Sequence, residues 1–386
     1  MPFDPIREEP LSHSDDTPLL TTPLDSLHRD LGGKMVPFAG YAMPVQYPAG
    51  IMAEHLHTRG GAGLFDVSHM GQAEIIGTGA AAALETLVPG DIVGLGLGRT
   101  RYTVFTNDQG GILDDLMVSK LAEDRLFVVV NAACKDADIA HMRANLKGVE
   151  LRLLDRALLA LQGPEAATVM ARLAPDSAAM DFMTIRELAV AGIPCVATRS
   201  GYTGEDGFEV SVPADRAEEL ARALLAQPEV KPIGLGARDS LRLEAGLCLY
   251  GSDIDTATTP VEAGLSWIIG KRRRDEGGFP GAAVVRKQLA EGAPRKRVGI
   301  RPDGRMPARA HTEITDLDGA VIGEITSGGF GPSADGPVAM GYVPAAFAAP
   351  GTRVRLVVRG KAIDAAVTTM PFVPHRYFKG PSPSGV

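Results

Sequence analysis

Cysteine is scarce in this sequence of 386 residues, and long apolar runs are missing. The three cysteines, Cys134, Cys195 and Cys248, are odd in number and widely spaced, so they predict neither a disulfide framework nor a paired zinc-ligand motif. No apolar stretch approaches the roughly 18 residues that cross a bilayer. We therefore expect a protein of a reducing compartment that has no membrane partner.

An excess of positive charge is also lacking. The chain has 39 lysines and arginines against 47 aspartates and glutamates, a formal net charge of -8. Phosphate binding requires a concentrated basic face, so we expect no nucleic-acid partner.

The first 17 positions are acidic where a secretory or transit segment would be basic, with Asp4, Glu8, Glu9, Asp15 and Asp16 against a single Arg7. Residues 1–17 are therefore predicted to be a disordered leader of a cytoplasmic protein.

Metal and dinucleotide motifs are missing too. His55 and His57 are two residues apart and have no third ligand nearby, so no metal site is expected. The glycines of 94–98 lack the spacing and the strand–turn–helix context of a dinucleotide fingerprint. The composition itself, 45% hydrophobic and 22% charged, is that of a globular protein, and the length suits two to three domains.

The secondary-structure signals change along the chain. Residues 102–106, 112–119 and 126–130 read as three strands of an antiparallel meander, separated by turn clusters. A strand at 208–212 precedes a helix, because Ala217, Leu220, Ala221 and Leu224 recur on one helical face. Beyond Pro294, short β runs between Gly- and Pro-containing turns predict a small barrel. The fold class is therefore α+β, with a C-terminal β-barrel.

Two adjacent carboxylates, Asp114 and Asp115, follow the turn Gly110–Gly111 in an otherwise apolar strand. Successive strand residues face opposite sides, so one Asp shares a face with Ile112 and the other with Met117. An acidic side chain facing a core is costly unless it is hydrogen-bonded or meets a cation. Either one Asp caps the turn and the other is solvated, or one of them faces a nitrogen-rich substrate. The pattern alone leaves both open.

Glu209 ends a glycine-rich segment, 201–209, that runs into a strand. A carboxylate held on such a strand can bind the two adjacent N–H donors of an aminopyrimidine in bidentate fashion. The alternative is an exposed strand position opposite a buried Phe208. Both interpretations remain open at this point.

Two arginine-containing segments could bind an anion. In the predicted helix 237–246, Asp239 can pair with Arg242, which leaves Arg238 for an external carboxylate. The alternative is a surface helix with a local ion pair. The run Lys271–Arg274 is predicted to be a solvated face, and it is also our candidate for contact with an anionic ligand or partner.

The sequence resembles the aminomethyltransferase (T-protein) family of the glycine cleavage system from about residue 22 to 379. Eight family strings occur in family order: GGKMVPFAGY (32–41), LFDVSHM (64–70), GGILDDL (110–116), GYTGEDGFE (201–209), ARDSLRLEAGLCLYG (237–251), TTPVEAGLSW (258–267), TSGGFGPS (326–333) and MPFVP (370–374). Together they make a chance match implausible.

This resemblance implies a three-domain cloverleaf around a central folate cavity. Domain 1 would comprise 18–59 and 148–240, and domain 2 would comprise 60–147 and 241–290. Residues 291–380 would form the C-terminal barrel. The resemblance also implies that Asp115 is the catalytic carboxylate. The folate-binding residues would be Glu209, Arg238, Tyr377, Trp267 and Asn131.

The activity implied is transfer of an aminomethyl group from the lipoyl arm of the H-protein to tetrahydrofolate. Ammonia and dihydrolipoyl carrier would be released, and 5,10-methylenetetrahydrofolate formed. Two alternatives share the fold, namely a folate-binding iron–sulfur maintenance protein and a stand-alone relative of the folate domain of sarcosine or dimethylglycine dehydrogenases. The first is marked by a cysteine that the segment 199–206 lacks. The second normally carries a flavin domain.

Overall fold

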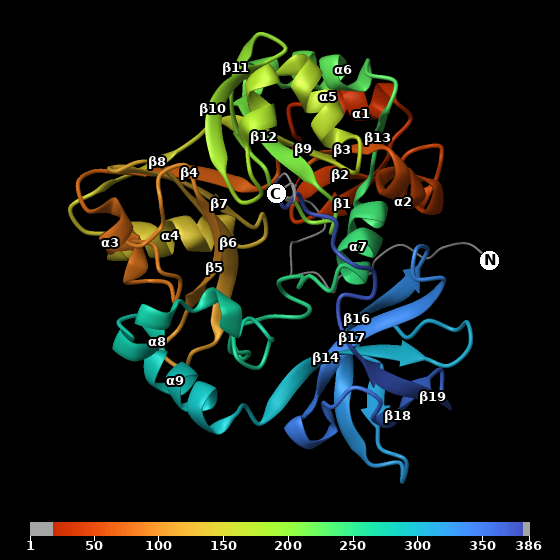
Figure 1. Ribbon diagram of the computed structural model, residues 1–386. Coiled ribbons are helices and arrows are strands. Elements are labelled where there is room, and N and C mark those ends of the chain that lie inside the picture. The colour runs from red at the N-terminus through yellow and green to blue at the C-terminus, as the bar shows by residue number, and fades with distance from the viewer. Residues whose placement is uncertain (1–17, 381–386) are drawn as a thin grey trace, which may run out of the picture.

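The computed structural model describes residues 18–380, so the predicted leader, 1–17, lies outside the described residues. Helices and strands are mixed, and three lobes surround a common centre (Figure 1). This confirms the α+β class. Among residues 18–380, no helix is long and apolar enough to cross a membrane.

The first lobe is built on a six-stranded sheet whose order is β10-β11-β12-β9-β3-β13. Its strands are β3 (Ala62–Asp66), β9 (Arg156–Gln162), β10 (Ile185–Val190), β11 (Ile193–Thr198), β12 (Gly207–Pro213) and β13 (Val230–Pro232). Its helices are α1 (Asp25–Asp30), α2 (Ile51–Gly60), α5 (Ala166–Leu173) and α6 (Ala217–Leu225). The predicted apolar face of α6 is fully buried in the core of this lobe, which confirms that helix.

The second lobe is built on a five-stranded sheet whose order is β5-β6-β7-β4-β8. Its strands are β4 (Gly71–Ile76), β5 (Thr100–Thr106), β6 (Ile112–Ala122), β7 (Arg125–Val130) and β8 (Glu150–Leu153). Its helices are α3 (Ala80–Glu85), α4 (Lys135–Asn145), α8 (Lys271–Glu276) and α9 (Ala282–Glu291). Strands β5, β6 and β7 pair antiparallel in sequence order, which confirms the predicted meander.

The chain crosses between the two lobes one strand away from the predicted boundaries. The family resemblance places the domain boundaries at 59/60 and 147/148. Strand β3, however, pairs with β9 and β13 of the first lobe, and β8 pairs with β4 of the second. Sequence periodicity identifies a strand but not its neighbour, so the sheet that receives an edge strand could not be read from it.

The third lobe is a closed barrel with the strand order β14-β17-β16-β15-β18-β19, as predicted. Its strands are β14 (Arg295–Pro302), β15 (Glu313–Thr315), β16 (Val321–Gly331), β17 (Gly336–Pro344), β18 (Arg353–Val358) and β19 (Lys361–Thr368). Short 3₁₀ turns occur at Pro175–Ala179, Ala214–Arg216, Ser266–Ile268 and Ala345–Phe347. Closure leaves the small sheet no free edge.

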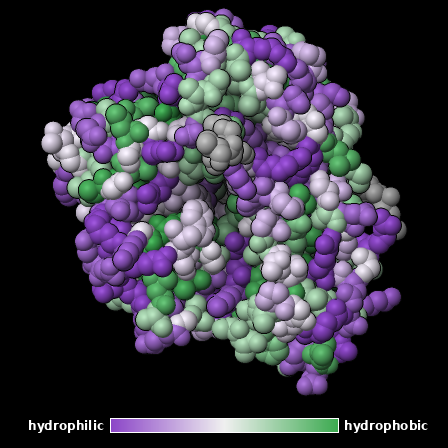
Figure 2. Space-filling model, viewed as in Figure 1, coloured by the Kyte–Doolittle hydropathy of each residue, from purple (hydrophilic) through white to green (hydrophobic). Residues whose placement is uncertain are grey.

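Helix α7 (Leu235–Glu244) lies at the centre, between the first lobe and the barrel (Figure 1). It packs against α2 and against β2 (Tyr41–Gln46), which pairs with β1 (Lys34–Phe38), and it also contacts the barrel strands β16 and β17. The predicted stop after this helix is correct, since Gly246 adopts a φ of +69°, a conformation that glycine tolerates without strain. The space-filling view is hollowed near its centre, where the three lobes meet (Figure 2).

Candidate functional site

The two adjacent aspartates lie on opposite faces of β6. Asp114 is fully buried between Ile112 and Leu116, whereas Asp115 shares its face with Met117 and is partly buried. The turn that precedes them is capped by Asn107, whose Oδ1 accepts hydrogen bonds from the backbone N–H groups of residues 109 and 111. The interpretation in which one Asp caps the turn and the other is solvated is therefore wrong. Asn107 was available for that role because an Asn or Asp side chain readily caps the turn that it begins.

Two side chains donate hydrogen bonds to the Asp115 carboxylate. The Tyr102 hydroxyl donates to Oδ2 at 3.0 Å, and the Asn131 amide donates to Oδ1 at 2.7 Å. Burial, followed by the charge of Asp114, raises the pKa of Asp115 to about 7, and the two hydrogen bonds act in the opposite direction. A carboxyl group whose pKa lies close to the working pH can accept or release a proton. The geometry therefore provides a fixed group suited to acid–base or electrostatic chemistry.

Asn131 connects the two aspartates. Its backbone N–H and its side-chain Nδ2 each donate to Asp114 at 3.0 Å, while Nδ2 also reaches Asp115. The residue follows the last position of β7, beside the middle of β6. Because acceptors surround the Nδ2 atom, the orientation of the amide is determined by its neighbours.

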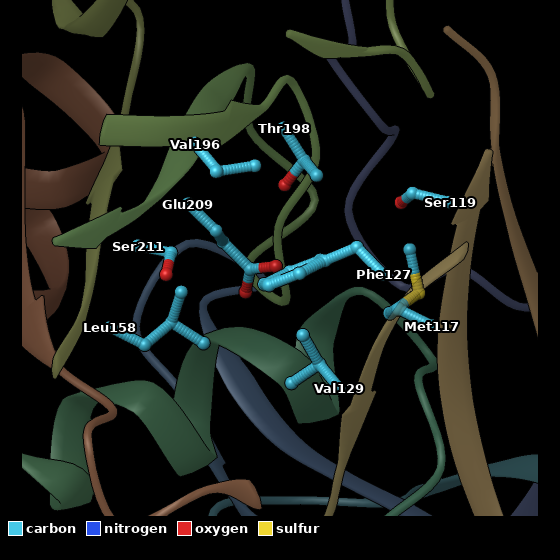
Figure 3. Close-up of a pocket in the computed structure, with 9 residues that line it drawn as sticks. All are labelled: Met117, Ser119, Phe127, Val129, Leu158, Val196, Thr198, Glu209 and Ser211. Carbon is cyan, nitrogen blue, oxygen red and sulfur yellow. The ribbon is translucent and has the colours of Figure 1, made fainter. Parts of the chain in front are cut away.

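Glu209 lies where the first and second lobes face each other. Phe208 and Val210 point into the core of the first lobe, so Glu209 points the other way, into a hollow between the two sheets (Figure 3). The hollow holds about 10 Å³, and it is lined by Met117, Ser119, Phe127, Val129, Leu158, Val196, Thr198, Glu209 and Ser211. It has room for little more than one water molecule. Glu209 is thus a partly buried carboxylate with apolar neighbours.

Burial raises the pKa of Glu209, while the charge of Arg238 and a 3.3 Å hydrogen bond from the Ser200 hydroxyl lower it. Arg238 comes from α7 and stacks over the Tyr202 ring at 4.7 Å. Its buried Nη1 atom has no hydrogen-bond partner among residues 18–380. Asp239 pairs with Arg242 at 2.8 Å, as predicted. A buried donor without a partner is costly, so Arg238 is suited to an acceptor on a ligand.

The two remaining predicted folate-binding residues, Trp267 and Tyr377, lie in different parts of the molecule. The Trp267 ring is 65% exposed and stacks on Tyr102 with 5.8 Å between ring centroids, which puts it beside the group that holds Asp115. Tyr377 instead stacks on Phe182 at 4.3 Å and touches His375. No contact between described residues joins Tyr377 to Asp115.

Sequence reasoning missed Tyr102 and Tyr202. Tyr102 was seen only as part of a predicted strand, and Tyr202 only as part of the glycine-rich segment. Tyr202 interacts electrostatically with both Asp115 and Arg238, so it connects the two parts of the site. Neither tyrosine has a sequence signal of its own. Strand pairing brings Tyr102 opposite Met117, and from there its hydroxyl reaches Asp115.

The prediction that Lys271–Arg274 forms a solvated face is wrong for two of its arginines. Arg272 forms ion pairs with Glu85 and Asp91, at 2.6 and 2.7 Å. Arg273 is 4% exposed and donates to backbone carbonyls at positions 85, 88 and 278. These arginines hold α8 against the end of α3 and the segment that follows it, so they are not available to an external anion. The sequence predicts a solvated face for this basic run because its acidic partners, Glu85 and Asp91, lie in a distant part of the chain.

Neither His55 nor His57, the two histidines considered above, is placed to bind a metal ion. His55 contacts Ser240, Glu244 and Ser333, and His57 contacts two backbone carbonyls. In the described part of the chain, no group of three His, Cys, Asp or Glu side chains could hold a metal ion.

Comparison with known proteins gives matches over most of the described residues. The model described as "GCVT N-terminal domain" matches residues 24–273, and "Glycine cleavage T-protein C-terminal barrel domain" matches 295–374. The chain is 48% identical to "Aminomethyltransferase, mitochondrial" of Dictyostelium discoideum, covering 95% of each chain. It is 51% identical to the protein of that name from Gallus gallus, covering 93% of this chain and 94% of that one.

A solved structure agrees with these sequence matches. The glycine cleavage system aminomethyltransferase T from Bartonella henselae superposes with a TM-score of 0.89 at 46% identity. The alignment covers 94% of this chain and all of that one. The likeness therefore extends over all three lobes.

Proposed function

This chain belongs to the glycine cleavage T-protein (GCVT) family and is an aminomethyltransferase, and from that premise we propose that Asp115 is its catalytic carboxylate. Tetrahydrofolate would be the one-carbon acceptor, and the lipoylated H-protein would be the donor. The proposed folate-binding residues are Glu209, Arg238, Asn131, Trp267 and Tyr377. The observation that carries the proposal is the Asp115 carboxylate itself, held by Tyr102 and Asn131 beside an exposed aromatic ring.

The role of Asp115 follows from the charge that develops in the reaction. Loss of ammonia from an S–CH2–NH3+ group leaves a carbon that stays bonded to sulfur and carries a sulfur-stabilised positive charge, until the folate amine attacks it. A fixed, partly buried carboxylate stabilises that positive charge without having to reorganise. Asp115 can also accept the proton that an attacking amine loses, since its pKa of about 7 matches the working pH. Tetrahydrofolate, when bound, supplies the amines that accept the one-carbon unit.

Glu209 and Arg238 supply complementary groups for the folate. A partly buried carboxylate matches the paired N–H donors of an aminopyrimidine, and a guanidinium matches an acceptor oxygen. The unpartnered Nη1 of Arg238 supports this assignment, because ligand binding would satisfy it. Trp267 offers an exposed aromatic face above Tyr102.

We expect Glu209→Gln to weaken tetrahydrofolate binding about 10- to 100-fold, the usual cost of losing a charge-assisted hydrogen bond. Titration of the protein with tetrahydrofolate, followed by fluorescence or calorimetry, gives the Kd. Glu187→Gln, on an exposed position of β10, is the matched control and should leave the Kd unchanged. Equal Kd values for the two variants would remove Glu209 from the folate site.

Tyr102→Phe should shift the acid limb of the pH profile. The hydroxyl lowers the pKa of Asp115, so its removal raises that pKa, and a higher pH is needed to ionise the carboxyl. We expect the acid limb of kcat/KM near pH 7 in the wild-type protein, and in the variant it should move to higher pH. Tyr250→Phe is the control, since its hydroxyl reaches the Ile112 carbonyl and not Asp115. A limb that stays in place would mean that another group controls it.

The reaction itself is tested by ammonia release. The protein is mixed with H-protein that carries an aminomethylated lipoyl arm, with and without tetrahydrofolate. We expect rapid ammonia release only when tetrahydrofolate is present. Release at the same rate in its absence would contradict the folate-dependent transfer. Neither of the two alternative functions is favoured, because the matches to aminomethyltransferases cover nearly the full length of both chains.

A cytoplasmic location remains a prediction from the acidic residues of 1–17. The relatives from Dictyostelium discoideum and Gallus gallus are named as mitochondrial proteins. Cell fractionation with an antibody against the chain distinguishes the two locations.

A further inference from the structure

After the barrel, the chain runs back to the first lobe as the return segment, 371–380, which is the dark blue end of the ribbon in Figure 1. Two N–H groups near its start donate to the Glu244 carbonyl, at 2.9 and 3.1 Å. The Arg376 N–H donates to the Gly204 carbonyl at 2.8 Å. Within the described residues, no backbone hydrogen bond reaches 377–380. The end of the return segment is therefore held by its side chains.

Two aromatic contacts hold that end. The Tyr377 ring stacks on Phe182, with 4.3 Å between the centroids and 14° between the planes. The Arg199 guanidinium lies over the Phe378 ring, 3.7 Å from its centroid. Stacked rings and cations above rings both stabilise a contact beyond the area that they bury. Phe182 and Arg199, both from the first lobe, thus determine where Tyr377 lies.

Arg199 is a rigid partner, because other contacts fix it on the first lobe. Its side chain is 4% exposed and donates two hydrogen bonds to the Asp206 carboxylate, at 3.0 and 2.6 Å. Its Nη1 donates to the Met180 carbonyl at 2.6 Å, and the guanidinium also lies over the buried Phe208 ring. A guanidinium plane that is fixed in this way offers a flat stacking surface. Phe378 therefore meets a preformed partner.

Phe182 lies in a loop that the first and second lobes hold together. The next residue, Met183, has a φ of +61°, a backbone conformation that bulky residues rarely adopt. Its N–H donates to the Arg199 carbonyl at 2.8 Å, and its carbonyl accepts the Thr100 N–H of the second lobe at 2.9 Å. Such a conformation persists only where the surroundings impose it, and it is most frequent at functional sites. The loop is therefore a rigid support for the Phe182 ring.

The Tyr377 hydroxyl forms no hydrogen bond within residues 18–380. Burial raises the pKa of Tyr377 to about 12, so the hydroxyl stays protonated at neutral pH. A phenol of this kind can donate a hydrogen bond to an acceptor on a ligand. The ring is thus fixed by its neighbours, while its polar end is available.

We propose that Phe182 and Arg199 anchor the end of the return segment to the first lobe and thereby position Tyr377 for the folate. Both are positioning residues, because they act on the ligand through Tyr377 and Phe378. The inference rests on the folate-binding role proposed for Tyr377. A side chain that is fixed before the ligand arrives loses little entropy on binding. Loss of the anchor should therefore weaken folate binding and leave the chemical step unchanged.

The first test measures the anchor by limited trypsin digestion of the folded protein, with mass spectrometry to identify the cuts. Phe182→Leu removes the stacked ring and should raise the rate of cleavage after Arg376 about three- to tenfold, because that bond is cut only when the segment opens. Phe378→Leu, which removes the ring beside Arg199, should act in the same direction. An unchanged rate in either variant would overturn the proposal.

Two further variants separate the stacking from general packing. Phe182→Tyr keeps an aromatic ring and should restore the wild-type cleavage rate. Phe347→Leu, at a partly buried position of the barrel, is the control and should leave the rate after Arg376 unchanged. Equal acceleration by Phe182→Leu and Phe347→Leu would show a general loss of stability and would overturn the proposal.

The second test is the Kd for tetrahydrofolate, together with kcat at saturating folate. Phe182→Leu should raise the Kd about three- to tenfold and keep kcat within about twofold, since no group beside the reacting atoms changes. In the Tyr377→Ala background, Phe182→Leu should have no further effect on the Kd, because it acts through the Tyr377 ring. Additive effects of the two substitutions would contradict the positioning role.

The two tests distinguish a failure of the anchor from a failure of the folate role of Tyr377. If Tyr377→Ala leaves the Kd unchanged while Phe182→Leu still speeds cleavage, the folate role fails and the positioning role fails with it. If Tyr377→Ala raises the Kd while Phe182→Leu changes neither the Kd nor the cleavage rate, the anchor alone fails.

Discussion

Asp115→Asn should reduce turnover about 10²- to 10³-fold while tetrahydrofolate still binds. Removing one fixed electrostatic group from an active site has a cost of this size. The Asn side chain has nearly the same shape, so the contacts from Tyr102 and Asn131 rearrange without opening a cavity. Ammonia release from aminomethylated H-protein measures turnover, and a folate titration measures binding.

The control for this prediction is Asp124→Asn, which changes an exposed aspartate in the turn between β6 and β7. It removes the same charge from the same sheet and should leave both readouts unchanged. Near-normal methylene transfer by Asp115→Asn would exclude Asp115 from the mechanism. Loss of folate binding without loss of maximal turnover would instead make it a binding residue.

The second large effect concerns stability. Arg59→Leu should destabilise the protein by about 3–5 kcal/mol, because it removes the buried guanidinium that two buried carboxylates share and leaves them only Arg376 and His55 as basic partners. Arg59 is 8% exposed and pairs with Glu205 at 2.7 Å and with Glu244 at 2.9 Å, and both glutamates are almost fully buried. The loss would appear as a lower Tm and a lower denaturant midpoint.

The same ion pairs join the lobes. Arg59 comes from α2 of the first lobe and Glu244 from the end of α7, while Glu244 also accepts backbone N–H groups at Ser333 and Ala334 of the barrel. Arg222→Leu, on the exposed face of α6, removes a surface pair with Glu218 and should change Tm little. Equal Tm values for the two variants would show that the central network does not hold the lobes together.

Local structure was predictable where one segment determines it. The meander of β5 to β7, the apolar face of α6 and the β texture of the barrel follow from periodicities of two and 3.6 residues. The positions of β3 and β8 were not predictable, because their partners come from distant parts of the chain. The same is true of Arg272 and Arg273, whose contacts lie in the segment 85–91.

The candidate site was predictable only as separate pieces. Strand alternation correctly placed Asp114 and Asp115 on opposite faces, and helix spacing correctly paired Asp239 with Arg242. Tyr102 had no signal, because it becomes significant only when its neighbour on another strand, Asp115, is known. Roles that came from the family resemblance, such as that of Tyr377, remain proposals.

The most direct test of this account is a structure of the protein with tetrahydrofolate bound. We predict an Asp115 carboxylate oxygen at about 2.6–3.2 Å from a ring nitrogen of the reduced pterin, or one water molecule away. A bound pterin far from Asp115, with that carboxylate directed into solvent, would contradict the mechanism.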